Sequence, residues 1–315
     1  MSRVAAIDCG TNSIRLLVAD ISNDNFREIH RDMEIVRLGQ GVDATGEFDP
    51  EAIERTLTAT RKFAEIIQSK GAEKIRFCAT SATRDASNRE MFINGVKEIL
   101  GIEPEVIPGV EEASLSFIGA TKELKHTEAP YLVVDIGGGS TEFVFGNEEV
   151  KYAKSVNIGC VRMSERHLKV QPPKPLDIQN AIVDIDAAIV EASHIVPIKE
   201  AKTLIAVAGT ATTVAAAALG LNDYDRYGIH LSRVPAEKVF EVAQKFLLMK
   251  REELAALPYM HPGRVDLIAA GSLVLSRVMI ATGAKEFIAS ESDILDGIAW
   301  SLAGQSSENL EVAEF

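Results

Sequence analysis

Two short segments of this chain combine an acid, a glycine turn and hydroxyl groups after a strand of buried character. They read Asp-Cys-Gly-Thr-Asn-Ser at 8–13 and Asp-Ile-Gly-Gly-Gly-Ser-Thr at 135–141. A glycine turn exposes backbone N–H groups because no Cβ blocks the approach of a ligand, and such groups bind phosphate oxygens. The carboxylate at the strand end would repel phosphate, but it can hold a divalent cation that binds phosphate. The pair therefore indicates a cleft that holds a phosphorylated ligand from both sides.

The two turns supply a set of candidate binding residues. Donors to phosphate, through backbone N–H groups and hydroxyls, would be Gly10, Thr11, Asn12, Ser13, Gly137, Gly138, Gly139, Ser140 and Thr141. Asp8 and Asp135 would hold Mg²⁺, or Mn²⁺, in part through water. The alternative is two ordinary strand-ending turns, because Gly and Asp are common in turns. The hydroxyls in both turns favour phosphate binding.

Two adjacent acids, Glu111 and Glu112, begin a helix directly after Pro-Gly at 108–109. Acids in a first helical turn are favoured by the helix dipole by ~0.3–1 kcal/mol, which explains them without any chemistry. A carboxylate at this place could also accept the proton of a water that attacks phosphorus. Position alone favours the first explanation and leaves the second open. Glu142, directly after the second turn, is either a strand residue that faces solvent or a ligand of metal or water.

Three further residues each allow two interpretations. Arg84 follows Thr-Ser-Ala-Thr at the end of a strand, and it forms either a surface ion pair or a fork that binds phosphate. Gly209 and Thr210 lie between a hydrophobic strand and an alanine-rich helix. They either bind an anion at the helix start or allow close packing of the helix.

Strands alternate with helices along the chain, which is typical of an α/β protein. In the first half we expect strands at 3–7, 14–21, 74–79 and 105–107. We expect helices at 50–70 and 111–120, and a third helix that starts at a capping box at 87–90 and ends at residue 100. In the second half we expect strands at 131–134, 143–145, 150–158 and 203–207, a helix between 176 and 195, and mostly helix from 236. The internal repeat is limited to the glycine-turn units.

Composition narrows the class of protein. A chain of 315 residues predicts two domains, at 1–124 and 125–315, with the last helix packing back on the first domain. The absence of a run of eighteen apolar residues argues against a membrane span. The net charge of −13 argues against general nucleic-acid binding. Three cysteines without metal-like spacing fit a reducing cytoplasm.

These motifs resemble those of a known family. The segment 133–142 is similar to the phosphate loops of the actin-like ATPase domain superfamily. Together with it, a set of shorter motifs resembles the exopolyphosphatase / guanosine pentaphosphate phosphatase (Ppx/GppA) family, in its short two-domain form, and they lie at 79–88, 105–113, 158–162, 208–213, 264–275 and 294–297. The resemblance implies two actin-like (ribonuclease H-like) α/β domains with a phosphate-binding cleft between them.

The resemblance also implies a function and assigns roles. Glu111 would be the catalytic base, Arg84 would contact the phosphate chain, and Asp135 and Glu142 would lie at the metal and the attacking water. The expected activity is Mg²⁺-dependent hydrolysis of the terminal phosphate of inorganic polyphosphate in the cytoplasm. The alternatives are hydrolysis of guanosine pentaphosphate, a small-molecule kinase of the same superfamily, and an actin-like filament protein. A homodimer is expected from the family alone.

Overall fold

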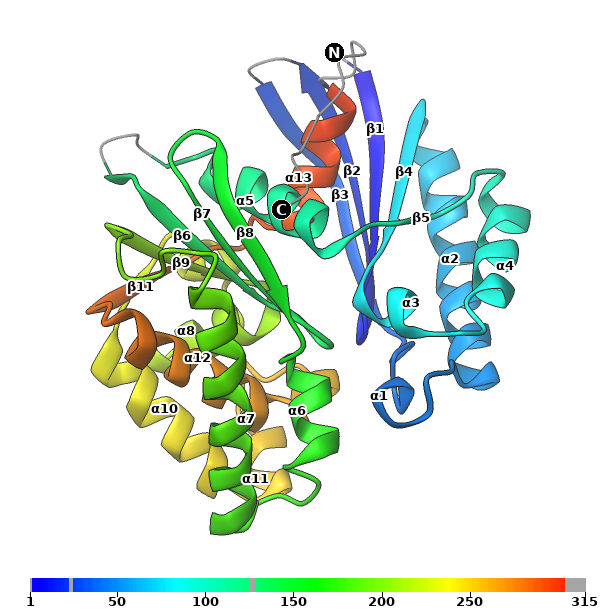
Figure 1. Cartoon of the computed structure of the whole chain (residues 1–315). Coiled ribbons are helices and arrows are strands. Elements are labelled where there is room, and N and C mark those ends of the chain that lie inside the picture. Colours follow the sequence, from blue (N-terminus) through cyan, green and yellow to red (C-terminus); the bar gives the residue numbers. More distant parts are fainter. Residues whose placement is uncertain (1, 23–24, 125–127, 304–315) are drawn as a thin grey trace.

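The computed structural model describes residues 2–22, 25–124 and 128–303, and it contains two α/β halves (Figure 1). The predicted domain boundary falls beside residues 125–127, outside the described residues, and stays a prediction. The predicted α/β class with two halves is confirmed by the two separate sheets and their covering helices. Within the described ranges, no helix combines the length and apolar character that crossing a membrane requires.

The first half is built around one twisted sheet. Its strands lie in the order β3-β2-β1-β4-β5. The strands are β1 (Ser2–Cys9), β2 (Ser13–Ser22), β3 (Asn25–Ile35), β4 (Lys74–Ala79) and β5 (Glu105–Val106). The helices are α1 (Val42–Thr45), α2 (Pro50–Lys70), α3 (Ser81–Asp85), α4 (Glu90–Leu100) and α5 (Gly109–Thr121).

The second half has a sheet of the order β10-β11-β9-β6-β7-β8. The strands are β6 (Tyr131–Ile136), β7 (Thr141–Gly146), β8 (Val150–Val156), β9 (Thr203–Val207), β10 (Arg233–Pro235) and β11 (Glu286–Ala289). The helices are α6 (Cys160–Arg166), α7 (Pro175–Ser193), α8 (Ala208–Leu219), α9 (Arg226–Ile229), α10 (Ala236–Leu248), α11 (Arg251–Ala255), α12 (Ile268–Thr282) and α13 (Ile294–Ala303), with a 3₁₀ turn at Pro262–Arg264.

The repeat of the fold extends through both sheets, beyond the glycine-turn units in which the sequence repeat is visible. In the first sheet, β1, β2 and β3 form an antiparallel meander, and β4 and β5 continue parallel to β1. In the second sheet, β6, β7 and β8 form the same meander, and β9 and β11 continue parallel to β6. Each strand of the first sheet therefore has a counterpart, and β10 is added at the far edge.

The ends of two helices test the capping residues that the sequence predicted. The predicted start of α2 is confirmed, because the Asp49 side chain accepts a hydrogen bond from the Glu51 N–H and Gly71 ends the helix with φ 66°. The predicted capping box before α4 is wrong. The helix begins at Glu90, with Arg89 at the N-cap position and no side-chain cap, so Ser87 lies too early in the chain to cap it. The Asn88 side chain bonds both backbone groups of Phe48, at 2.8 and 3.0 Å.

The faces of the first sheet bury different partners. Alternate residues of β1 and β2, such as Ile7 and Leu16, pack with α2 and α4. The opposite face, which includes Ala6 and Leu17, packs with α13 from the end of the chain. Because side chains alternate along a strand, one strand serves both cores.

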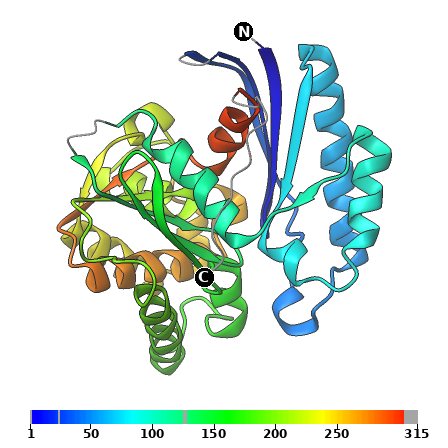
Figure 2. The same cartoon turned by 45° about the horizontal axis from the view of Figure 1, so that its top comes forward.

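The last helices of the two halves are exchanged. Helix α5 follows β5 of the first sheet but packs on the second sheet, whereas α13 follows β11 of the second sheet but packs on the first. The two helices lie side by side in both views (Figures 1 and 2). A Cβ on Gly119 would lie 1.9 Å from the carbonyl oxygen of Asp293, and one on Gly297 would lie 2.0 Å from that of Leu115. Glycine at both positions therefore allows the helices to meet through their backbones.

Candidate active site

The two glycine turns have the same geometry and touch each other. The N–H of Gly10 donates to the carbonyl of Ser13 at 3.0 Å, and the N–H of Gly137 donates to that of Ser140 at 3.1 Å. A Cβ on Gly139 would lie 2.8 Å from Oγ1 of Thr11, so the second loop needs glycine for this approach. The repeat of the sheets therefore brings both loops to one place between the halves.

A cleft of about 110 Å³ lies between these loops. Most predicted site residues line it, namely Asp8, Gly10, Thr11, Asn12, Ser13, Asp135, Gly137, Gly138, Gly139, Ser140, Gly209 and Thr210. The cleft wall also contains residues that had no assigned role in the predicted site, including Arg15, Thr80, Ser81, Glu112 and Arg264. Four predicted residues do not line it, namely Arg84, Glu111, Thr141 and Glu142.

Glu111 lies outside the cleft, and its neighbour Glu112 lies inside. The Glu111 carboxylate is 41% exposed and pairs with Arg76 at 2.5 Å, on the side that also holds Glu105. The Glu112 side chain is buried and lines the cleft. Consecutive residues of a helix point about 100° apart, so only one of the two acids can face the loops. The structure therefore does not support Glu111 as the group that reaches a bound phosphate.

Arg84 contacts this buried acid. Its Nη1 donates to Oε2 of Glu112 at 2.7 Å and to the carbonyl of Ile107 at 2.9 Å. Neither of the two interpretations of Arg84, a surface ion pair or a phosphate fork, describes this arrangement, because the partner acid is buried and Arg84 does not line the cleft.

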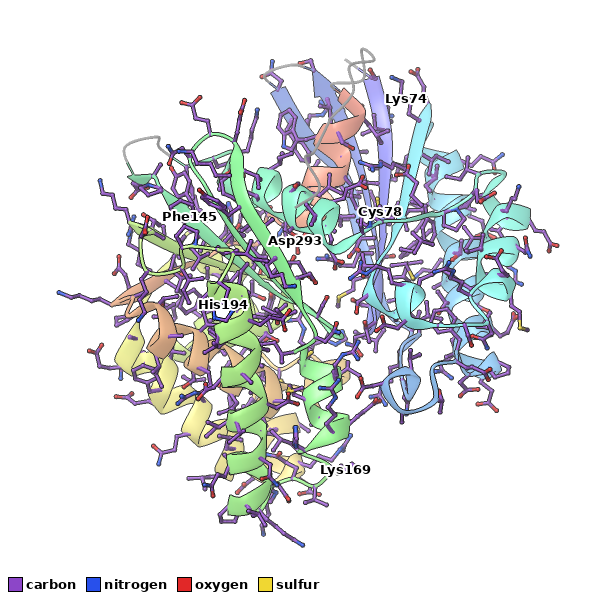
Figure 3. All side chains as sticks on the ribbon, in the orientation of Figure 1. Lys74, Cys78, Phe145, Lys169, His194 and Asp293 are labelled. Carbon is purple, nitrogen blue, oxygen red and sulfur yellow. The ribbon has the colours of Figure 1, made fainter. Side chains whose placement is uncertain are left out.

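Each strand-end acid faces a different residue across its hairpin. Asp8 is paired in register with Arg15, whose Nε and Nη2 donate to Oδ2 of Asp8 at 2.9 and 2.6 Å. Arg15 also binds Asp293, which lies between the two halves (Figure 3). Asp135 is paired in register with Glu142, a second acid. The first acid therefore faces an arginine, which it shares with Asp293, whereas the second acid faces another acid.

Two hydroxyl groups donate hydrogen bonds to the second acid pair, Asp135 and Glu142, and so offset part of its negative charge. The Ser116 hydroxyl of α5 donates to Oδ2 of Asp135 at 2.6 Å, and the Ser155 hydroxyl of β8 donates to Oε1 of Glu142 at 2.7 Å. Oε2 of Glu142 is buried and has no hydrogen-bond partner in the described part of the chain. A buried polar atom without a partner is costly, so this atom indicates a missing ligand or water.

The acids in and beside the cleft differ in the direction in which their surroundings shift their pKa. Burial, together with the charge of Asp293, raises the pKa of Asp135 to about 7. Burial and the charges of Glu112 and Asp135 raise the pKa of Glu142 well above its usual range. Burial also acts on Asp293, but the Arg15 guanidinium outweighs it and lowers the pKa of that carboxyl. Excess negative charge is therefore concentrated around Asp135 and Glu142.

This charge distribution fits a hydrated divalent cation. Within the described ranges, no three Asp, Glu, His or Cys side chains are arranged as a ready cage for a metal. Mg²⁺ usually keeps several waters and binds through one or two carboxylates plus substrate phosphates, so it needs no such cage. The unpartnered Oε2 of Glu142 and the raised pKa of Asp135 mark where a cation would offset charge. Asp8 has Oδ2 occupied by Arg15, which leaves its other oxygen for a water.

One wall of the cleft carries the guanidinium of Arg264. A Cβ on Gly209 would lie 2.5 Å from Cζ of Arg264, so glycine makes room for this guanidinium. Nη1 of Arg264 donates to the Thr213 hydroxyl at 3.0 Å, and Cζ lies 5.7 Å from the centre of the Tyr224 ring. Across the ranges that the structure describes, Arg264 forms no ion pair, and its charge is available to an anion in the cleft.

Comparisons with known proteins agree on one family. A family model described as the Ppx/GppA phosphatase family matches residues 17–305. Exopolyphosphatase 2 of Mycobacterium tuberculosis is 47% identical, over 96% of this chain and 99% of its own length. The crystal structure of an exopolyphosphatase-like protein has 45% identity and a TM-score of 0.92, and the match covers 96% of this chain and 98% of that one. The Aquifex aeolicus PPX-GPPA enzyme has 28% identity and a TM-score of 0.80, with 95% and 99% covered.

Proposed function

The chain belongs to the Ppx/GppA phosphatase family, and from this we propose that it hydrolyses the terminal phosphate of inorganic polyphosphate. The observation that carries the proposal is the cleft between two phosphate-type loops, which has the buried Glu112 on its wall. The name of the relative that is 47% identical over nearly the whole chain, exopolyphosphatase 2, supports polyphosphate as the substrate.

The proposed mechanism is in-line attack of water on the terminal phosphorus. N–H groups of the two loops and the Arg264 guanidinium would bind the phosphate oxygens as negative charge moves toward the leaving oxygen. Glu112, in place of Glu111, would accept the proton of the water. The bond from phosphorus to the bridging oxygen breaks, which releases orthophosphate and a chain shorter by one unit. A divalent cation held near Asp135 and Glu142 would neutralise phosphate charge.

Guanosine pentaphosphate is the second candidate substrate. The family description includes GppA, and both substrates present a terminal phosphoanhydride to the same loops. The loops alone give no preference between them. Membership of a phosphatase family removes the support for the kinase and filament alternatives.

The test compares phosphate release from polyphosphate and guanosine pentaphosphate with Mg²⁺ present. We expect the higher kcat/KM with polyphosphate, and a clear preference for the nucleotide would replace polyphosphate as the main substrate. Release from neither substrate would refute the hydrolase proposal.

Two adjacent variants test the assignment of the base. Glu112→Gln removes a general base and should lower kcat by about 10²- to 10⁴-fold. Glu111→Gln is the matched control, because it changes the same residue type one position away and removes only a half-exposed ion pair. We expect Glu111→Gln to keep kcat within about twofold of wild type, since such ion pairs contribute little. The opposite pattern would return the role to Glu111.

A further inference from the structure

We propose that Arg84 is a positioning residue that holds the Glu112 carboxylate in place for proton transfer, and that it does not bind the phosphate chain. The inference rests on the proposed function, because it assigns Arg84 through Glu112. It departs from the expectation for Arg84 that followed from the motif alone.

The contacts of Arg84 carry this assignment. Its Nη1 is shared between Oε2 of Glu112 at 2.7 Å and the carbonyl of Ile107 at 2.9 Å. The Arg84 side chain is 23% exposed and the Glu112 side chain is 11% exposed, so the pair is largely shielded from solvent. Arg84 itself does not line the cleft, whereas Glu112 does. The acid therefore lies between the arginine and the place where phosphate would bind.

The carboxylates around Glu112 explain why its own carboxylate needs the positive charge of Arg84 beside it. The carboxylate of Glu112 lies close enough to those of Asp8, Asp135 and Glu142 for their negative charges to repel one another. The Thr80 hydroxyl offers Glu112 a hydrogen bond. Burial raises the pKa of Glu112, and the Arg84 guanidinium opposes this rise. Without Arg84, a buried carboxylate among three other acids would take up a proton or turn away from the cleft. Either change would remove the base.

The bond also joins elements that belong to different sheets. Arg84 lies on α3, directly after β4 of the first sheet, whereas Glu112 lies on α5, which packs on the second sheet. Glu112 therefore keeps its place near Asp135 through α5 and its place relative to the first loop through Arg84.

The kinetic test separates positioning from substrate binding. Arg84→Gln should lower kcat by about 10- to 100-fold, because a charge-assisted hydrogen bond to the base is lost, and KM should stay within about twofold. A phosphate ligand would instead raise KM when it is removed. In the Glu112→Gln background, Arg84→Gln should cause no further loss of kcat, since the two residues act as one unit. A raised KM with kcat unchanged, or independent losses in the double variant, would overturn the proposal.

Two further variants control for a general effect of removing an arginine and for loss of folding. Arg76→Gln is the matched control, because Arg76 pairs with the neighbouring Glu111 outside the cleft, and kcat should not change. Arg84→Lys keeps one positive donor and should restore part of the lost kcat, which also covers the case in which Arg84→Gln does not fold. If Arg84→Lys is as impaired as Arg84→Gln while folded, the charge is not what positions Glu112.

A measurement without turnover keeps this inference separate from the proposed function. The pKa of the Glu112 carboxyl, followed by NMR in protein with labelled glutamate and assigned with Glu112→Gln, should be higher in Arg84→Gln than in wild type. An unchanged pKa would overturn the positioning role. Absence of phosphate release by the wild-type protein would refute the proposed function and leave the NMR result to decide on Arg84.

Discussion

Replacing Asp135 with Asn is expected to stabilise the protein at pH 8, whereas the same replacement of Asp293 is expected to destabilise it. Both carboxyls are buried in the same cluster between the two halves. Their surroundings differ, because Asp135 faces Glu142 across its hairpin and Asp293 binds Arg15. One substitution made at two neighbouring acids should therefore give opposite signs.

The sign follows from the proton that each acid binds. The pKa of Asp135 is about 7 in the folded protein against an ordinary value of 3.8, so the folded state keeps a proton that the unfolded state has lost. Stability therefore falls as the pH rises from about 4 to about 7 and stays low above that. The pKa of Asp293 is lowered by Arg15, so its contribution is present at pH 8 and is lost in acid.

The magnitude can be bounded from the same shift. A difference of about three pKa units corresponds to about 4 kcal/mol, at about 1.4 kcal/mol for each unit. Neighbouring acids share this proton, so the bound is an upper one, and we expect a gain of about 1 to 4 kcal/mol for Asp135→Asn at pH 8. The Asn side chain still accepts the hydrogen bond from Ser116, so the packing around it is preserved.

The assay is urea unfolding of wild type and both variants at pH 5 and pH 8. The gain of Asp135→Asn should be larger at pH 8 than at pH 5, and the variant should lose phosphate release if Asp135 holds the cation. Such a gain in stability with a loss of activity is the usual trade-off at a functional site. The reasoning is refuted if Asp135→Asn is less stable than wild type at pH 8, or if both variants shift in the same direction.

Three other perturbations test the contact between the halves and the cation. Gly119→Ala should destabilise the protein by about 1–3 kcal/mol in urea unfolding, because its Cβ would meet the Asp293 carbonyl, and an unchanged midpoint would contradict the close approach of α5 and α13. Arg162→Ala should cost about 3 kcal/mol, because Asp85 and the Gly139 carbonyl lose this partner and Asp43 keeps only Arg166. Arg61→Ala, the control at an exposed ion pair, should cost less than about 1 kcal/mol, and equal losses would argue against the Arg162 bridge. Removal of divalent cations with EDTA should abolish phosphate release and added Mg²⁺ should restore it, so release that persists in EDTA would exclude the cation from the reaction.

Sequence patterns predicted the elements correctly where these depend on residues close together in the chain. Both glycine turns were found because a buried strand, a glycine and a hydroxyl occur within a few residues, and the helix α2 was found from its caps. Strand β3 was missed because Asn25–Ile35 is rich in charge and lacks buried residues. It is an edge strand that pairs only with β2, so its place depends on a neighbour and not on its own apolar pattern.

The choice between Glu111 and Glu112 could not be made from sequence for a similar reason. Helix α5 is covered by the second sheet on one side and by α13 on the other, so its buried residues are spread around it. A helix without a clear polar face gives no indication of which acid points outward. The partner that draws Glu111 away from the cleft is Arg76 of β4, which is distant in sequence.

The repeat of the fold and the absence of a repeat in its charges together indicate where hydrolysis would take place. The residue opposite the strand-end acid is Arg15 in the first half and Glu142 in the second, at the same register position. Asp8 therefore has an arginine beside it, which it shares with Asp293, whereas Asp135 faces a second acid. A cation would offset the two acids in the second half, and α5 brings Glu112 to the same cleft. In the proposed mechanism both loops and Arg264 would bind phosphate, and a cation would act at the acid pair opposite the second loop, with Glu112 of α5 on the same cleft wall.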